Sequence, residues 1–417
     1  MPPVLSRMRP PRSPNISFIT LALAVSGCGG QTSQSSLVVS SDPELAVIGA
    51  ELLPRLAERA GMDLSHPVRI EARSRAQLVS YLRLKLDEDL PEDEARARRD
   101  TYALLGLVEP DLGLRNLLLG LYTEQVAGFY DPDSTALFVL DDQPEAALEA
   151  LLLHELVHAV QDQNVRLDEL VDPGRGNDAV TAAQAAIEGH ATLVMFEYLT
   201  EQAAGSPIDL SQIPDFASQV RPALAGVSQQ FPALADAPRI IRESLLFPYV
   251  EGAIFVQRLW ADGERHNPLG RFMPGSTEQV VYASADRSID LAIFVDRGKV
   301  VLQDGLGAFE LQIFLEEVLE VPGGIAGEGA AGNLAAMWDG DHYVLVESSD
   351  GDRHLVWVVL WSDEDAHHQF TERIWSHEDN LGGTVSVERI VVEGRSATLL
   401  QVGGLVDVIV ERAPSKS

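Results

Sequence analysis

The chain has 417 residues, of which 46% are hydrophobic and 23% are charged. This length and composition suit a packed core with about two domains, and they exclude a largely disordered chain. The 63 acidic residues outnumber the 31 basic residues and give a formal net charge of −32. Because such a surface repels nucleic acid and anionic membranes, we expect no nucleic-acid partner.

The first residues of the chain have the pattern of an export signal. Three arginines precede the apolar run 16–25, which is too short to span a bilayer but suits the hydrophobic region of a signal peptide. The sequence VSGC, ending at Cys28, resembles the bacterial lipobox. The resemblance implies a lipoprotein signal peptide at 1–27, a lipid on Cys28 and a location in the bacterial cell envelope. The alternative is an ordinary export signal in which this cysteine is incidental.

Residues 28–42 are expected to form a flexible tether, because serine, threonine and glutamine are frequent there. Apolar residues then recur at three- and four-residue spacing, which predicts helices. The predicted helices are 43–60, 75–86, 91–107 and 111–124, with a short strand at 68–72. The next segment, GFYDPDSTALFVLDD at 128–142, predicts two strands joined by a turn.

A helix is predicted at 144–164, and it contains the motif HELVH. His154 and His158 lie one helical turn apart on the same face, near enough to hold one metal ion. Glu155 is one step round the helix, where a carboxylate can reach a water activated by that metal. With this composition, H-E-x-x-H is expected by chance only about 0.02 times per chain. The alternative is a hydrogen-bonded histidine pair in a buried helix.

A catalytic zinc site usually needs a third protein ligand. Glu188 lies in an apolar stretch of the helix predicted at 178–200, next to Gly189, which would permit close approach of another helix. Burying an unpaired carboxylate is unfavourable, and a dication would offset that penalty. The alternative is a solvent-facing glutamate, while His190 would compete as a ligand only if the helix broke there.

These two segments together resemble a known class of enzymes. HELVHAVQD resembles the zinc-binding helix of thermolysin-type enzymes, and EGHAT is similar to the E-G-x-A-T stretch of the alanyl-aminopeptidase type. Both belong to the gluzincin metallopeptidases. YTEQVAGFYDP, PYVEGAIFV and STEQV are similar to segments of a largely uncharacterised bacterial family of predicted secreted HExxH peptidases. The resemblance implies one Zn²⁺ per chain held by His154, His158 and Glu188, with Glu155 as the general base.

The chain also departs from those enzymes. The 29 residues between His158 and Glu188 exceed the spacing in either type, and the absence of a G-x-M-E-N segment argues against an aminopeptidase. Thr192 stands where thermolysin-like enzymes have an aspartate that orients a zinc-binding histidine. We expect Asp162 to take that task, with a solvent-exposed role as the alternative. Four tyrosines are unranked candidates for stabilising an oxyanion: Tyr130, Tyr198, Tyr249 and Tyr282.

Beyond a Gly/Ala-rich loop at 323–332, five alternating runs predict strands, with a helix at 363–375 between the second and third. We find no site there and expect His367, His368 and His377 to lie on the surface. The expected organisation is α+β: a mainly helical, zincin-like metallopeptidase domain with a small sheet at 43–290, then a smaller α+β domain at 291–413.

The function expected from these features is that of a lipid-anchored zinc peptidase, and we expect an endopeptidase. Its partners would be a peptide or protein substrate and, through Cys28, a membrane. The predicted strand 136–140 would offer an edge on which substrate lies extended. One alternative is a non-catalytic envelope lipoprotein that keeps the scaffold for binding or assembly, although pure metal binding would not need Glu155. Another is a zinc hydrolase with a non-peptide substrate.

Overall fold

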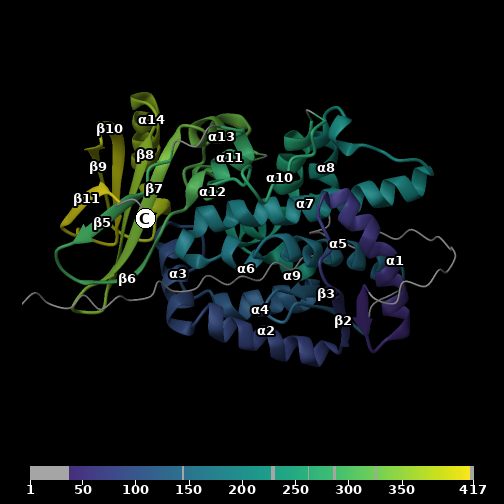
Figure 1. Ribbon diagram of the computed structural model, residues 1–417. Helices are drawn as coiled ribbons and strands as arrows, with labels where there is room; N and C mark the ends of the chain where they lie inside the picture. Colours follow the sequence, from purple (N-terminus) through teal and green to yellow (C-terminus); the bar gives the residue numbers. More distant parts are fainter. Residues whose placement is uncertain are drawn as a thin grey trace, which may run out of the picture.

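The computed structural model describes residues 37–142, 145–226, 231–261, 263–284, 288–324 and 326–413. The predicted signal peptide, Cys28 and most of the tether lie outside these residues. The tether prediction is wrong for its last residues, because residues 38–40 form a strand that pairs with residues 68–70. Helices dominate the first two thirds of the described chain, and long strands dominate the last third (Figure 1). This arrangement confirms the α+β class.

A four-stranded sheet lies in the first part of the chain. Its strands are β1 (Val38–Ser40), β2 (Val68–Arg73), β3 (Gly128–Asp131) and β4 (Ala136–Leu140), in the order β1-β2-β4-β3. The strands β1, β2 and β4 are parallel, and β3 runs antiparallel to β4. The prediction that strand 136–140 offers a free edge is therefore wrong. The turn before Thr135 folds the chain back and leaves β3 at that edge of the sheet.

The early helices agree well with the sequence pattern. They are α1 (Pro43–Ala60), α2 (Arg75–Asp89), α3 (Glu92–Leu104), α4 (Leu114–Gln125) and α5 (Glu145–Asn164). The helix α1 has the predicted bounds because Asp42 caps its first turn and Gly61, with a φ of 65°, ends it. The helix α3 is shorter than predicted. The chain turns out of it at Gly106, whose φ is 77°.

The central helices bring distant parts of the chain together. They are α6 (Leu167–Leu170), η1 (Pro173–Arg175), α7 (Asn177–Ala204), η2 (Leu210–Gln212), α8 (Phe216–Ala225), α9 (Pro232–Asp236), α10 (Arg239–Trp260) and α11 (Thr277–Tyr282). The helices α7 and α10 cross at Gly189 and Gly252. A methyl group on Gly189 would lie only 2.0 Å from the carbonyl carbon of Gly252. The expectation that Gly189 permits close approach of another helix is confirmed.

The last third of the chain forms a second, larger sheet. Its elements are β5 (Leu291–Val295), β6 (Lys299–Asp304), α12 (Gly307–Glu317), α13 (Gly329–Ala335), β7 (Trp338–Glu347), β8 (Arg353–Trp361), α14 (Glu364–Ser376), η4 (Glu378–Asn380), β9 (Val385–Val392), β10 (Arg395–Val402) and β11 (Val408–Arg412). Five strands pair in the antiparallel order β6-β7-β8-β10-β9, and β11 pairs with β5.

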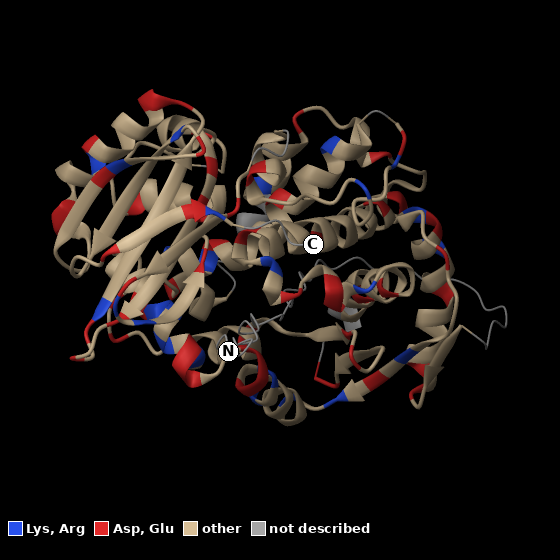
Figure 2. Cartoon of the chain, turned by 60° about the vertical axis from the view of Figure 1, so that its left-hand side comes forward, with Lys and Arg blue, Asp and Glu red and all other residues tan. Residues whose placement is uncertain are grey.

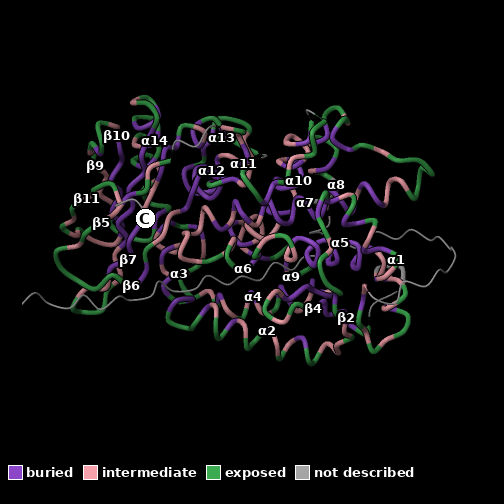
Figure 3. Tube along the Cα trace, viewed as in Figure 1, coloured by how far each residue is buried: buried purple, intermediate pink, exposed green. Residues whose placement is uncertain are grey.

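The hydrophobic core crosses the boundary predicted at residue 290. One cluster joins the helices α2–α4 to α12 and the second sheet, and it includes Leu82, Leu121, Phe314 and Trp357. A second cluster joins α1, α5 and α7 to the first sheet. Buried positions follow α5 and α7 through the middle of the molecule (Figure 3). The division into two domains stays a prediction, since the larger core draws on both segments.

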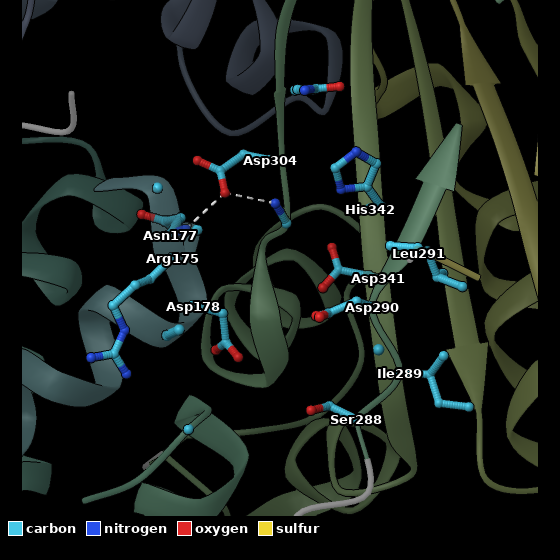
Figure 4. A pocket seen from close by; sticks show the side chains of 18 of the residues that line it. Arg175, Asn177, Asp178, Ser288, Ile289, Asp290, Leu291, Asp304, Asp341 and His342 are labelled. Atoms are coloured by element: carbon cyan, nitrogen blue, oxygen red, sulfur yellow. Dashed lines mark hydrogen bonds between the residues drawn. The ribbon is translucent and has the colours of Figure 1, made fainter. Parts of the chain in front are cut away.

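A cavity of about 350 Å³ lies where the N-terminus of α7 meets the last third of the chain (Figure 4). Asp304 accepts a hydrogen bond from the backbone N of Asn177 at 2.7 Å. Asp341 accepts hydrogen bonds from the backbone N atoms of Leu306 and Gly307, at the start of α12. Two carboxylates therefore satisfy backbone groups at the N-termini of helices, where negative charge is favourable.

The surface reflects the acidic composition. Acidic residues are spread over both halves of the molecule in the view of Figure 2. In the described part of the chain, no helix combines the length and the apolar character needed to cross a membrane.

Candidate metal centre

The helices α5 and α7 bring the three expected ligands together. His154 Nε2 lies 3.0 Å from Glu188 Oε2 and 3.1 Å from His158 Nε2, while His158 Nε2 lies 3.3 Å from Glu188 Oε2. All three residues are buried. Within the described ranges, this is the one group of three or more His, Cys, Asp or Glu residues with donor atoms close enough to share a metal ion.

The spacing of these donor atoms fits a tetrahedral metal ion. Zinc bonds to nitrogen and oxygen are about 2.0 to 2.2 Å long, which places tetrahedral ligand atoms about 3.3 Å apart or slightly more. The three observed separations are close to this value. In addition, Glu188 Oε1 is buried and forms no hydrogen bond with the described residues. Two imidazoles and a buried carboxylate are also the donor types that zinc prefers.

The charges of the three side chains support a cation at this position. Burial alone would raise the pKa of Glu188, but the imidazoles of His158 and His154 outweigh it and hold that pKa well below its usual range. Burial alone would lower the pKa of His158, but Glu188 and Glu155 outweigh it and raise that pKa to about 9. The site therefore stabilises positive charge beside Glu188, and a metal ion would replace the proton there.

Glu155 lies beside the cluster but is not part of it. Its Oε2 accepts a hydrogen bond of 2.9 Å from the backbone N of Tyr130, on the edge strand β3. Only 3% of the residue is exposed. Because α5 supplies the side chain and β3 supplies the donor, the carboxylate is held in one orientation beside the three candidate ligands.

The orienting contact to His158 comes from a residue that the sequence analysis missed. His158 Nδ1 lies 2.8 Å from Gln161 Oε1. Asp162 instead accepts hydrogen bonds from the hydroxyl of Tyr130 (2.8 Å) and the backbone N of Leu167 (3.3 Å). The assignment of this task to Asp162 is therefore corrected. Side chains on a helix lean toward its N-terminus, so a long side chain three residues after His158 covers that histidine. This i, i+3 spacing was the available signal.

Two other polar residues near Glu188 lie outside the cluster. The helix α7 is unbroken at His190, as expected, and this side chain points to Gln161 and to the ring of Trp260. Burial lowers the pKa of His190 to about 3, so its ring is neutral. The hydroxyl of Thr192 is buried and makes no hydrogen bond with any described residue.

The structure ranks the four tyrosines. The ring centroid of Tyr249, on α10, lies 5.9 Å from that of His154. The hydroxyl of Tyr130 is bound to Asp162, whereas those of Tyr198 and Tyr282 contact Arg55 and the carbonyl of Gly332. Tyr249 is therefore the tyrosine that packs against a candidate ligand.

Two other buried polar residues, Glu251 and His367, lie outside the candidate metal centre. Glu251 on α10 pairs with Arg221 through two contacts of 2.8 and 2.9 Å, so its role is structural. His367 is buried, with its Nδ1 2.8 Å from Thr398 Oγ1, so its expected surface position is wrong. It lies on the face of α14 that packs on the second sheet.

The chain was compared with models of protein families, with curated proteins and with solved structures, and none of these matches it. The class of site therefore follows from the geometry alone: a buried group of two histidines and one glutamate that can hold a metal ion.

Proposed function

We propose that the protein is a zinc-dependent peptidase of the gluzincin type, attached to a membrane through a lipid on Cys28. The main support is the convergence of His154, His158 and Glu188 with donor separations of 3.0 to 3.3 Å. The presence of Glu155 beside this group favours catalysis over a purely structural metal site. A structural zinc site is usually closed by four protein ligands, whereas a catalytic one has three.

The proposed chemistry assigns separate tasks to the residues. Zinc, when bound by the three ligands, lowers the pKa of a water molecule and polarises the carbonyl of the scissile bond. Glu155 accepts a proton from the attacking water and returns it to the leaving amine. The hydrogen bond from the backbone N of Tyr130 keeps the carboxylate of Glu155 aimed for both transfers. The hydroxyl of Tyr249 is the candidate donor to the developing oxyanion.

The substrate is proposed to bind along β3, because β4 is internal to the sheet. The backbone N of Leu140 donates a hydrogen bond to the carbonyl of Ala127, so the backbone groups of residue 127 point to the segment that contains β4. In an antiparallel strand the backbone groups of every second residue point to the same neighbouring strand. The backbone groups of Gly128 and Tyr130 therefore face away from β4, on the side of Glu155. The N–H of Tyr130 is already bound to Glu155. An extended peptide added to this edge would therefore pair with the backbone groups of Gly128 and the carbonyl of Tyr130, with its scissile bond beside Glu155.

The experiment that tests this function compares the zinc-loaded wild type with Glu155→Gln on a diverse peptide library. Gln has nearly the same volume as Glu but cannot accept the proton. We expect hydrolysis to fall by about 10² to 10⁴-fold, with zinc content and melting temperature close to wild type. A chelator should abolish wild-type hydrolysis. If fully zinc-loaded wild type cleaves no peptide, the alternative of a binding or assembly lipoprotein replaces the peptidase.

A further inference from the structure

Gln161 links the two helices that carry the candidate zinc ligands. It is completely buried, with 0% of the residue exposed. Its Oε1 lies 2.8 Å from His158 Nδ1, and its Nε2 lies 3.0 Å from the carbonyl oxygen of Ile187 and 3.1 Å from His190 Nδ1. One side chain of α5 therefore contacts a ligand on its own helix and the residue that precedes Glu188 on α7.

These three contacts allow only one arrangement of protons. The carbonyl of Ile187 can only accept, so the amide group of Gln161 must present its nitrogen there. The amide oxygen then faces His158, and because it can only accept, the hydrogen must be on His158 Nδ1. The second amide hydrogen points to His190 Nδ1, which accepts it.

The arrangement leaves His158 Nε2 as the atom that carries the free electron pair in the neutral ring. This is the atom that lies 3.1 Å from His154 Nε2 and 3.3 Å from Glu188 Oε2. The hydrogen bond to Ile187 also ties the backbone beside Glu188 to α5. Gln161 thus sets both the ring orientation of one ligand and the backbone position next to another.

We propose that Gln161 is the positioning residue of the metal centre, holding His158 in the Nδ1–H form so that Nε2 binds the metal. This inference rests on the proposed function only in requiring that the three ligands hold zinc. Outer contacts of this kind typically contribute about 10- to 100-fold to metal affinity. A merely structural amide would instead affect the stability of the fold and leave the chemistry of His158 unchanged.

The test uses the zinc-loaded protein with Gln161→Met, which keeps the length of the side chain but removes the acceptor, and Gln161→Glu, which keeps an acceptor. The matched control is Gln163→Met. Gln163 is on the same helix, and its side chain accepts hydrogen bonds from the backbone N atoms of Ser65 and His66, away from the centre. Zinc affinity is measured by competition with a chelator. Nitrogen-15 NMR of labelled histidines identifies which nitrogen of His158 carries hydrogen.

In wild type we expect zinc bound through Nε2 and a His158 Nδ1–H that exchanges slowly with water. Gln161→Met should bind zinc about 10- to 100-fold more weakly and exchange this hydrogen quickly. Gln161→Glu should bind zinc more tightly than Gln161→Met, and Gln163→Met should match wild type in both measurements.

Two results would overturn the proposal: binding of zinc through His158 Nδ1 in wild type, or equal zinc affinity in Gln161→Met and Gln163→Met. If Gln161→Met does not fold, the hydrogen position in wild type and in Gln161→Glu decides: Nδ1–H in both supports the proposal, and coordination through Nδ1 overturns it. The two proposals can fail separately. If the protein hydrolyses no peptide, the peptidase proposal fails, but the zinc affinities and the NMR results still decide the role of Gln161.

Discussion

Gly189 and Gly252 are in backbone contact where α7 crosses α10, and each leaves room for the other helix. A methyl group on Gly189 would lie 2.0 Å from the carbonyl carbon of Gly252, and one on Gly252 would lie 2.2 Å from the carbonyl oxygen of Ala185. Because Gly189 directly follows Glu188, this crossing also places a candidate ligand. The packing of two helices and the geometry of the metal centre therefore depend on the same pair of glycines.

We predict that Gly189→Ala destabilises the protein by about 1 to 3 kcal/mol, the usual range for overpacking a buried site. It should also weaken zinc binding, since the helices must separate beside Glu188. Chemical denaturation and zinc titration measure the two effects. Gly120→Ala is the control, because Gly120 lies in α4 with no atom near the added methyl group. It should stabilise the helix by about 0.5 to 1 kcal/mol. Equal behaviour of the two variants would contradict the role of the crossing.

Local patterns were enough to predict the helices of the candidate site. The positions of His154, Glu155 and His158 relative to one another follow from helix geometry alone. Gly189 was also recognisable, since a small residue beside a buried carboxylate indicates close packing. The structure shows that Gly189 packs against the helix α10. Its contact there, Gly252, lies 63 positions further along the chain.

Non-local pairing could not be predicted in the same way. The strand β2 lies between β1 and β4, and alternation within a strand says nothing about its neighbours. For this reason the edge position was assigned to the wrong strand. The role of Gln161 was not predicted, because a neutral amide in a helix is not a typical metal ligand or acid–base group. Its contact nevertheless decides how His158 is held. The shared core across residue 290 depends on packing between α3, α12 and the second sheet.

The proposed lipid anchor predicts a specific modification of Cys28. Cells that express the protein should incorporate labelled fatty acid into it, and the protein should sediment with membranes. Cys28→Ala should lose the label, since this is the only cysteine in the chain and the lipobox resemblance places the lipid there. Equal labelling of Cys28→Ala, or no label in wild type, would contradict the anchor while leaving the zinc site untouched.

The candidate metal centre, if it holds zinc as proposed, predicts about one zinc per chain in purified protein. Each of the variants His154→Ala, His158→Ala and Glu188→Ala removes one of the three candidate ligands. Losing a residue that only contacts a ligand lowers metal affinity by up to about 100-fold, so we expect the loss of a ligand itself to lower zinc affinity by more than this. The control is Glu251→Gln, which changes a buried carboxylate that pairs with Arg221 rather than with the cluster. Metal analysis and zinc titration measure the result. Full zinc occupancy in Glu188→Ala would assign the third position to another residue.

The junction between α7 and the last third of the chain predicts a dependence of stability on pH. Asp178 accepts two hydrogen bonds from Thr277, through its backbone N and its hydroxyl. Burial raises the pKa of Asp178 to about 7. The hydrogen bonds from Thr277 oppose this shift, and the charges of Asp341 and Glu278 add to it. In the unfolded chain the same carboxyl has its ordinary pKa of about 4.

Between pH 4 and 7 the folded protein therefore keeps a proton on Asp178 that the unfolded chain has lost. The contribution of this group to stability is complete below pH 4 and disappears as the pH rises through about 7. Asn keeps the acceptor for Thr277 without a charge. The fall in melting temperature from pH 5 to pH 8 should therefore be smaller in Asp178→Asn than in wild type by about 2 to 5 °C. The control Asp111→Asn removes an exposed carboxylate and should behave as wild type. An unchanged pH dependence in Asp178→Asn would show that this carboxyl is already ionised in the folded protein at pH 5.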